Sequence, residues 1–233
     1  KCYEPYSRIE MNSRKRCFRR VRPENHKGAL LLAVENNYVE IVKLLLKNSN
    51  INVNSEFNFL SIDDESKRET ALNMALKNKN NEIIKLLLAM PNIDVNLKSI
   101  HNEDEETALS IALKNKDIEI IKLLLAIPNI NVNLKFIYNG NEETALNFAL
   151  KNNDILTVKL LLDNPEIDAN LISIFKEENG NKIETALIIA IKNKINEIID
   201  LLLKKPNIDV NLISKRNRER ETALICAIKN NDV

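Results

Sequence analysis

The sequence predicts an all-α solenoid built from helix–turn–helix units, and three observations support this prediction. A block of about 37 residues recurs six times, with starts at Gly28, Thr70, Thr107, Thr144, Thr185 and Thr222. Two apolar stretches in each block have the spacing of helices that bury one face. The blocks differ in length only just before the next start. Because such units bury their apolar faces only against their neighbours, the repeat determines the fold class.

The first half of each unit predicts a short helix. Thr70 is a good N-cap, and Glu69 before it suits the positive end of the helix dipole. Leu72, Ala75 and Leu76 lie at helical spacing. A small residue recurs at the position of Ala75, and it lets neighbouring helices approach closely.

A tight turn follows, at the stretch Lys77-Asn78-Lys79-Asn80 in the second unit. Because asparagine tolerates the left-handed conformation that a sharp turn needs, we expect an asparagine to adopt it rather than the lysine beside it.

The second half of each unit predicts a strongly apolar helix, which runs from Ile83 to Leu88 in the second unit. Prolines such as Pro91 stop these helices. From their phase we expect Leu86 and Leu123 to be buried. The solvated face should carry i,i+3 ion pairs, at Glu40–Lys43, Glu82–Lys85 and Glu119–Lys122.

The stretches between units read as surface loops, because spacings of 42, 37, 37, 41 and 37 residues separate the six starts. Two loops contain Asn-Gly, at Asn139-Gly140 and at Asn179-Gly180. This dipeptide favours the positive φ angles of a type I′ turn, so both sites predict tight hairpins.

Charge divides the chain into a basic N-terminal segment and an acidic remainder, and the cysteine content indicates the cellular compartment. Residues 1–27 hold nine Lys/Arg and three Glu, which gives +6 and leaves −5 on residues 28–233 because the whole chain carries +1. Three scattered cysteines form no disulfide framework, and the odd count favours a reducing compartment. We therefore expect an intracellular, cytoplasmic and monomeric protein that does not span a membrane.

The two ends of the chain are the least regular parts. The basic run Arg14–Arg22 is compatible with nuclear import or nucleic-acid binding, and equally with the solvated face of a cap helix. The sixth unit stops at Val233, after its first helix. We therefore expect Leu224 and Ile228 to lack the helix that would cover them.

Residues 28–233 resemble the ankyrin repeat family. The resemblance rests on the Thr-X-Leu start, the small residue in the first helix, the Glu-Ile-Ile/Val-X-Leu-Leu-Leu second helix and the Asp/Asn-Val-Asn exit. Glu40 to Leu46 followed by Asn52-Val53-Asn54 is especially close. The resemblance implies stacked antiparallel helix pairs with β-hairpin loops at one edge. It also implies protein binding through hairpin tips and first helices.

The chain departs from the family pattern at two positions. The histidine after Thr-Pro-Leu is replaced by Asn73, Ser110, Asn147, Ile188 or Ile225, and only Asn and Ser are able to substitute for its hydrogen bond. The glycine between the helices is replaced by Asn37, Lys79, Lys116, Asn153, Lys194 and Asn231.

The sequence offers no catalytic, cofactor or metal site, and we expect no enzyme activity. His26 and His101 have no neighbours at metal-ligand spacing, and His101 lies in an acidic loop. The three glycines form no phosphate-binding loop. Cys226 occupies a position that is Met, Ile or Phe in other units, so we read it as a packing residue.

Two sets of residues are candidates for partner binding. The first is a row of lysines at one repeat spacing, which predicts a basic stripe for an acidic partner: Lys77, Lys114, Lys151, Lys192 and Lys229. The second is a set of loop aromatics: Phe57, Phe59, Phe136, Tyr138 and Phe175. Exposed aromatics anchor interfaces, whereas the alternative for these rings is packing between adjacent loops.

The sequence as a whole predicts a non-catalytic protein-interaction scaffold whose partner is a protein. One alternative is the targeting arm of a larger enzyme, such as a kinase or ubiquitin ligase. Another is nucleic-acid binding through the basic segment, although that segment contains no recognisable nucleic-acid module.

Overall fold

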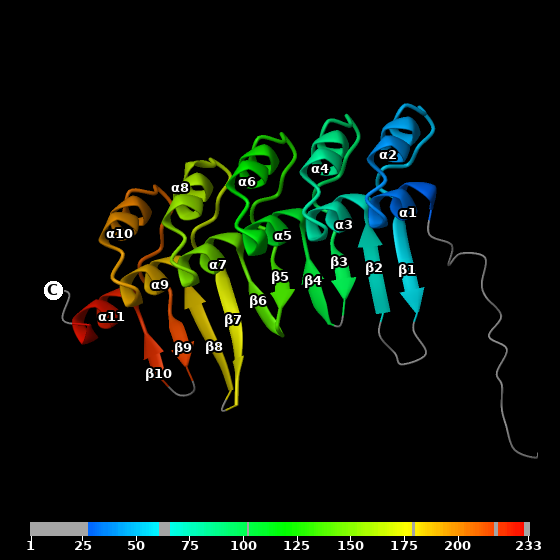
Figure 1. Cartoon of the computed structure of the whole chain (residues 1–233). Helices are drawn as coiled ribbons and strands as arrows, with labels where there is room; N and C mark the ends of the chain where they lie inside the picture. The colour runs from blue at the N-terminus through cyan, green and yellow to red at the C-terminus, as the bar shows by residue number, and fades with distance from the viewer. Residues whose placement is uncertain (1–27, 61–65, 102, 179, 217–218, 231–233) are drawn as a thin grey trace, which may run out of the picture.

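A computed structural model shows an elongated array of stacked helix pairs with a row of β-hairpins along one edge (Figure 1). It describes residues 28–60, 66–101, 103–178, 180–216 and 219–230. The basic segment 1–27 and Asn231 lie outside these residues.

The first helices of the units form one row of the array. They are α1 (Ala29–Glu35), α3 (Ala71–Lys77), α5 (Ala108–Asn115), α7 (Ala145–Lys151), α9 (Ala186–Lys192) and α11 (Ala223–Lys229). Five of them begin at the predicted threonine, whose side chain accepts the backbone N–H three residues on, as Thr70 does from Asn73 at 3.2 Å. The small residue is buried in α1, α3, α5, α7 and α9, as at Ala75, and is partly buried at Ala227 in α11.

The second helices form the outer row (Figure 1). They are α2 (Val39–Leu46), α4 (Asn81–Leu88), α6 (Ile118–Leu125), α8 (Ile155–Asp163) and α10 (Asn196–Leu203). Their buried side includes Ile84, Leu87, Ile121 and Leu124, each at most 1% exposed. The expectation for Leu86 and Leu123 was wrong, because Leu86 is only partly buried and Leu123 is 37% exposed.

The hairpins join into one antiparallel sheet in which the strands follow sequence order. The strands are β1 (Glu56–Leu60), β2 (Ser66–Thr70), β3 (Ser99–His101), β4 (Asp104–Glu106), β5 (Phe136–Tyr138), β6 (Asn141–Glu143), β7 (Ile172–Glu177), β8 (Gly180–Thr185), β9 (Ser214–Arg216) and β10 (Glu219–Glu221). The two longest hairpins, β1–β2 and β7–β8, belong to the two longest spacings. The additional residues therefore extend hairpins and leave the helix pairs unchanged.

The predicted type I′ turn is confirmed at Asn139-Gly140, with φ angles of 50° and 73° between the paired residues Tyr138 and Asn141. The other Asn-Gly pair behaves differently. Gly180 is already paired with Glu177 and has a φ of 120°, so it begins β8 instead of forming the turn. Asn179 lies outside the described residues.

The turns between helices contradict our expectation for asparagine in the units where lysine replaces the family's glycine. Lys79, Lys116 and Lys194 themselves adopt the left-handed conformation, with φ of 54° to 57°. Asn37 and Asn153 adopt it where asparagine occupies that position, with φ of 55° and 53°.

The histidine position is filled as the residue types suggested. Asn73 donates to the Leu97 carbonyl at 3.0 Å and to Ser99 Oγ at 2.8 Å, which ties its helix to the next hairpin. Ser110 forms a capping box with Thr107. Ile188 is buried and makes only apolar contacts with its side chain.

A second set of asparagines links the exits of consecutive units. Asn96 donates to the Asn129 carbonyl at 2.7 Å and accepts the Asn131 N–H at 2.8 Å. The same pair of bonds recurs at Asn54, Asn133 and Asn170. Each amide thus replaces two hydrogen bonds to water with two between units, which sets the spacing of the stack.

Candidate partner-binding surface

The predicted row of lysines lies along the edge where the first helices meet the hairpins. Each lysine reaches the glutamate that precedes its own unit's threonine. The Nζ–Oε distance is 2.8 Å for Lys77–Glu69, 3.2 Å for Lys151–Glu143 and 2.8 Å for Lys192–Glu184. Lys114–Glu106 and Lys229–Glu221 pair in the same way. We call these ten residues the Lys–Glu ladder.

The ladder is continued between units by second contacts. Lys77 also reaches Glu106 at 3.0 Å, and Lys192 lies 3.7 Å from Glu221. Burial works against the charged form of Lys77, but Glu69 and Glu106 outweigh it and raise the pKa of this lysine. Burial likewise opposes the ionised form of Glu106, yet Lys114 and Lys77 together lower its pKa.

The lysines therefore belong to a charge-balanced structure and do not form the free basic stripe that the sequence suggested. Four of the glutamates, Glu69, Glu106, Glu143 and Glu184, are at most 7% exposed. A buried carboxylate needs a cationic or hydrogen-bonding partner, so the lysine at each rung is required by the fold. The sequence signal for this arrangement was the Glu-Thr-Ala-Leu start that the last five units share, whose glutamate we read only as a dipole partner.

The aromatic candidates differ in how deeply they are buried. Phe136 is 1% exposed and Phe175 is 7% exposed, so both pack inside the hairpin layer. Phe57 is half-buried against the core. Phe59 belongs to β1, but its side chain lies outside the described residues. Tyr138 is half-exposed, with Lys114 Nζ 4.1 Å from its ring centre.

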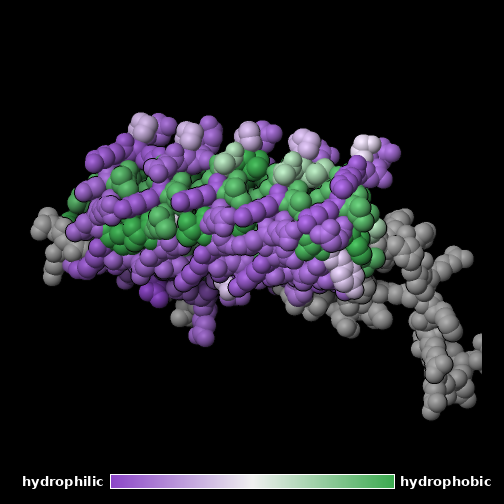
Figure 2. Space-filling view, turned by 45° about the horizontal axis from the view of Figure 1, so that its top comes forward, coloured by the Kyte–Doolittle hydropathy of each residue, from purple (hydrophilic) through white to green (hydrophobic). Residues whose placement is uncertain are grey.

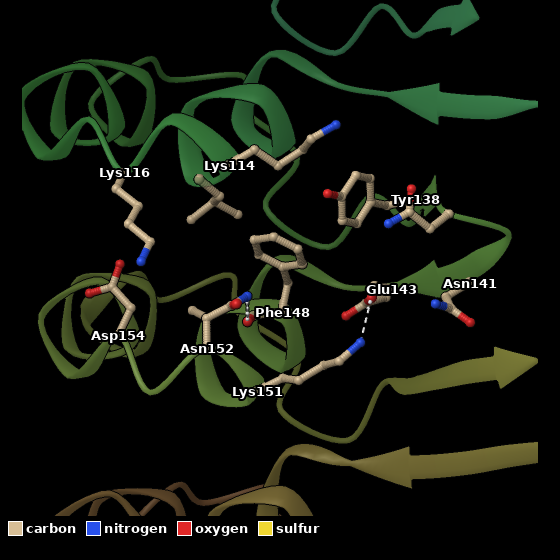
Figure 3. A pocket seen from close by; sticks show the side chains of 12 residues that line it. Lys114, Lys116, Tyr138, Asn141, Glu143, Phe148, Lys151, Asn152 and Asp154 are labelled. Atoms are coloured by element: carbon tan, nitrogen blue, oxygen red, sulfur yellow. Dashed lines mark hydrogen bonds and ion pairs between the residues drawn. The ribbon is translucent and has the colours of Figure 1, made fainter. Parts of the chain in front are cut away.

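A cavity of about 320 Å³ opens beside Tyr138, between the third and fourth units. Its walls come from the end of α5, the β5–β6 hairpin and α7 (Figure 3). Phe148 lies in the middle of this space and meets Phe136 and Tyr138 edge-to-face, with ring centres 5.6 Å and 6.0 Å apart. Glu143 lies at the side of the cavity next to Lys151.

Sequence analysis did not single out Phe148 or Glu143 as site residues. Phe148 is one of the apolar residues at the position equivalent to Cys226. The sequence signal that could have identified it is its larger side chain. Burial raises the pKa of Glu143, and the single lysine beside it, Lys151, does not offset that effect.

The cysteine and histidine side chains that the structure describes do not form a reactive or metal-binding site. Cys226 is buried, and desolvation raises its pKa to about 11, so its thiol is not an activated nucleophile. His101 is exposed and is paired with Asp104 across a hairpin. Within the described ranges, no three His, Cys, Asp or Glu side chains cluster to hold a metal ion. In the same ranges, none of the helices has the length and apolar character to cross a membrane.

The repeat architecture matches a known family model. The model for ankyrin repeats (3 copies) matches residues 11–99 and 98–173, which is well over half of the chain. The chain belongs to the ankyrin repeat family. The helix pairs and joined hairpins are thus those of an ankyrin array in which Asn or Lys replaces the glycine between the helices and Asn, Ser or Ile replaces the histidine of the first helix. No curated protein sequence matches the chain.

Solved structures share the ankyrin fold. The ankyrin repeat protein EF0377 is 27% identical, with a TM-score of 0.58 over 88% of this chain and 92% of that one. The ankyrin repeat domain of Bcl-3 is 22% identical, with a TM-score of 0.55 over 84% and 76%. A chain from the complex of a predatory endopeptidase of Bdellovibrio bacteriovorus with an immunity protein is 24% identical, with a TM-score of 0.54 over 88% and 93%.

Proposed function

We propose that this ankyrin repeat chain is a non-catalytic scaffold that binds a protein partner along the edge where the first helices meet the hairpins. Ankyrin repeats are generally protein-interaction modules, which supports the class of function. The observation that favours this edge is the cavity beside Tyr138, where a partly buried aromatic ring adjoins the hairpin residues Asn139, which is exposed, and Asn141, which is partly buried. Such a combination of an aromatic anchor with a polar rim suits a protein interface.

The proposed contacts are Tyr138 and the exposed parts of the five ladder lysines. Phe136 and Phe175 act indirectly in this proposal, because both are buried in the hairpin layer, where Phe136 packs against Phe148 and Phe148 meets Tyr138. The outer face of the second helices is a weaker candidate. Its charged side chains are engaged in ion pairs between units, such as Lys85–Glu119 at 2.7 Å and Lys159–Glu197 at 2.5 Å.

The face in Figure 2 also shows an apolar band along the array between hydrophilic ribs. A partner that lies lengthwise would cover parts of this band as well as the hairpin edge. This arrangement fits an extended interface made by several units.

Site-specific photo-crosslinking tests the proposal. A photoreactive phenylalanine derivative replaces Tyr138 in one variant and Lys122, which is exposed on the outer helix α6, in a matched control. We expect Tyr138 to give a discrete crosslinked protein in native lysate and Lys122 to give none. Equal crosslinking from both positions, or from Lys122 alone, would contradict the proposed face.

Two other functions remain as alternatives to be separated by experiment. A full-length reading frame with an adjoining kinase or ligase domain would make the array the recruiting arm of an enzyme. A salt-dependent shift with generic DNA or RNA would favour the basic segment 1–27 as the binding element. We also propose a monomeric, intracellular protein, which the free buried thiol of Cys226 supports.

A further inference from the structure

The junction between the third and fourth units lacks a hydrogen bond that neighbouring junctions have. The asparagine near the end of each first helix normally donates to the carbonyl of the preceding first helix. The distance is 2.8 Å for Asn115 to Leu76 and 3.0 Å for Asn193 to Leu150. Asn152 instead donates to the Phe148 carbonyl of its own helix at 2.8 Å. No side-chain amide within the described residues therefore reaches the Leu113 carbonyl.

The Lys–Glu ladder makes no contact between units at this junction, and the same holds between the fourth and fifth units, where Glu184 takes its second lysine, Lys182, from its own hairpin. Glu106, Glu184 and Glu221 each contact two lysines. Glu143 contacts only Lys151, because Lys114 lies over the Tyr138 ring and pairs with Glu106. Glu143 is fully buried, and its Oε2 atom has no hydrogen-bond partner among the described residues. It is the only ladder carboxylate with such an atom in that part of the chain.

Phe148 provides a physical reason for the missing amide bridge. The equivalent residues in the other units are smaller: Met74, Ile111, Ile189 and Cys226. The Phe148 ring stands between α5 and α7 and lines the cavity together with Leu113 and Glu143 (Figure 3). A large ring at a position of close helix packing keeps the two helices from forming the contacts that the smaller residues allow.

The cavity therefore has a defined chemistry. It presents a buried carboxylate oxygen, a helix-end carbonyl with spare acceptor capacity at Leu113, and aromatic walls from Phe148 and Tyr138. A complementary group needs several donors, no acceptors and a flat face that stacks on rings. The arginine guanidinium meets all three conditions, whereas the lysine ammonium is a compact, strongly hydrated point charge.

The lysines around the cavity do not oppose a further cation as strongly as their number suggests. Lys114 is paired with Glu106, and Lys151 with Glu143 Oε1. Lys116 and Asp154 face each other at the far side of the cavity (Figure 3). One added cation would give Glu143 two positive partners, which is the number that Glu106 and Glu184 already have.

We propose that this cavity is a receptor site for an arginine side chain of the partner protein. The guanidinium donates to Glu143 Oε2 and to the Leu113 carbonyl, and it stacks against Phe148. The inference rests on the proposed function, because it names the partner chemistry that the same surface recognises.

The test uses Nα-acetyl-arginine-N-methylamide as the probe, with the lysine and citrulline analogues as controls at constant ionic strength. NMR titration of the intact chain follows the ring signals of Tyr138 and Phe148. We expect saturable shifts with the arginine compound and at least tenfold weaker binding of both analogues. The citrulline analogue keeps the shape without the charge, and the lysine analogue keeps the charge without the planar fork.

Matched variants locate the site. Glu143→Gln should weaken arginine binding at least tenfold, whereas Glu184→Gln, at the same rung one unit later, should leave it within twofold, because neither lysine that Glu184 contacts lines the cavity. Phe148→Ile, which restores the usual residue size, should also abolish the ring shift at Tyr138. Circular dichroism checks that each variant is folded.

Equal binding of the arginine and citrulline compounds, or unchanged binding by Glu143→Gln, would overturn the arginine site. The photo-crosslink from Tyr138 reports separately on the proposed function. A persistent crosslink together with a failed arginine titration would show that a partner docks here by other contacts.

Discussion

At the scale of single residues, the turns show how neighbouring side chains decide which residue carries strain. Asn78 is helical, and its amide donates to the Val34 carbonyl of the preceding unit at 3.2 Å. Asn80 has a φ of −89° and a ψ of 89°, and its side chain caps the next helix by accepting the Ile83 N–H at 3.1 Å. Both asparagines are thus engaged in conformations that exclude the left-handed one. Lys79 between them adopts it, with a φ of 54°.

Lys79→Gly should therefore stabilise the array, by about 0.5–1 kcal/mol, because glycine tolerates a positive φ without a Cβ clash. Urea unfolding at neutral pH measures the change. Lys79→Ala is the matched control, since it removes the charge but keeps the Cβ atom. A gain of the same size in the alanine variant would assign the effect to charge and refute the strain argument.

The buried glutamates give a second prediction at this scale, because the pKa of Glu106 is lowered and that of Glu143 is raised from the usual 4.5. The stabilisation from Glu106 is complete above pH 4.5 and is lost as pH falls through its folded pKa. Ionised Glu143 instead costs stability, and that cost disappears as pH falls towards 4.5.

Glu106→Gln should cost about 1–3 kcal/mol at pH 7, because it leaves Lys77 and Lys114 without a shared carboxylate. Its effect should shrink below pH 4.5, whereas wild type should gain stability relative to Glu143→Gln as pH falls from 7 to 4.5. Chemical unfolding between pH 3 and 7 measures both slopes. Slopes of the same sign would contradict the pKa assignments.

At the scale of elements, the second helices show why hydrophobic periodicity alone predicted the wrong leucines to be buried. Three consecutive leucines, such as Leu123, Leu124 and Leu125, give no contrast between neighbouring positions. Leu124 is the fully buried one, because Ile120 and Ile121 set the inner side of the helix with it. The outer face also differs from expectation. Of the three predicted i,i+3 pairs, the structure shows Glu40–Lys43, while Lys43 and Lys85 reach Glu82 and Glu119 of the next unit.

Leu124→Ala should cost about 2–5 kcal/mol, because it leaves a cavity in the core of the stack. Leu123→Ala serves as the matched control one position away, where the side chain is 37% exposed, and it should cost less than half as much. Denaturant unfolding compares the two variants. Equal losses would mean that the second helix is rotated from the position described.

At the scale of the whole molecule, stability is shared among junctions between neighbouring units. The exit asparagines form the same pair of bonds across four junctions, the third-to-fourth one included. The inner side of that junction lacks both the Asn152 bridge and the second lysine of Glu143. We therefore infer that the array is weakest between α5 and α7.

Hydrogen exchange should reveal this weak point. Amides at the facing ends of α5 and α7 should exchange faster at low denaturant than those at the α3–α5 contact. Phe148→Ile should slow their exchange, since it allows Asn152 to bridge to Leu113. Uniform protection along the array, unaffected by that substitution, would contradict an interrupted junction.

The sequence by itself determined the repeat, the threonine caps, the helix pairs and the Asn139-Gly140 turn, because each depends on contacts within a few residues. The features that depend on the stacking of units were seen only in the tertiary structure. The Lys–Glu ladder, the left-handed lysines and the cavity at Phe148 all arise where two units meet. Residues far apart in the sequence, such as Lys77 and Glu106, are brought into contact there, and a pattern read along one unit does not show which side chains face each other across the junction. The proposed function divides in the same way. The repeat in the sequence indicates a binding protein, whereas the proposed binding site is seen only where the third and fourth units meet.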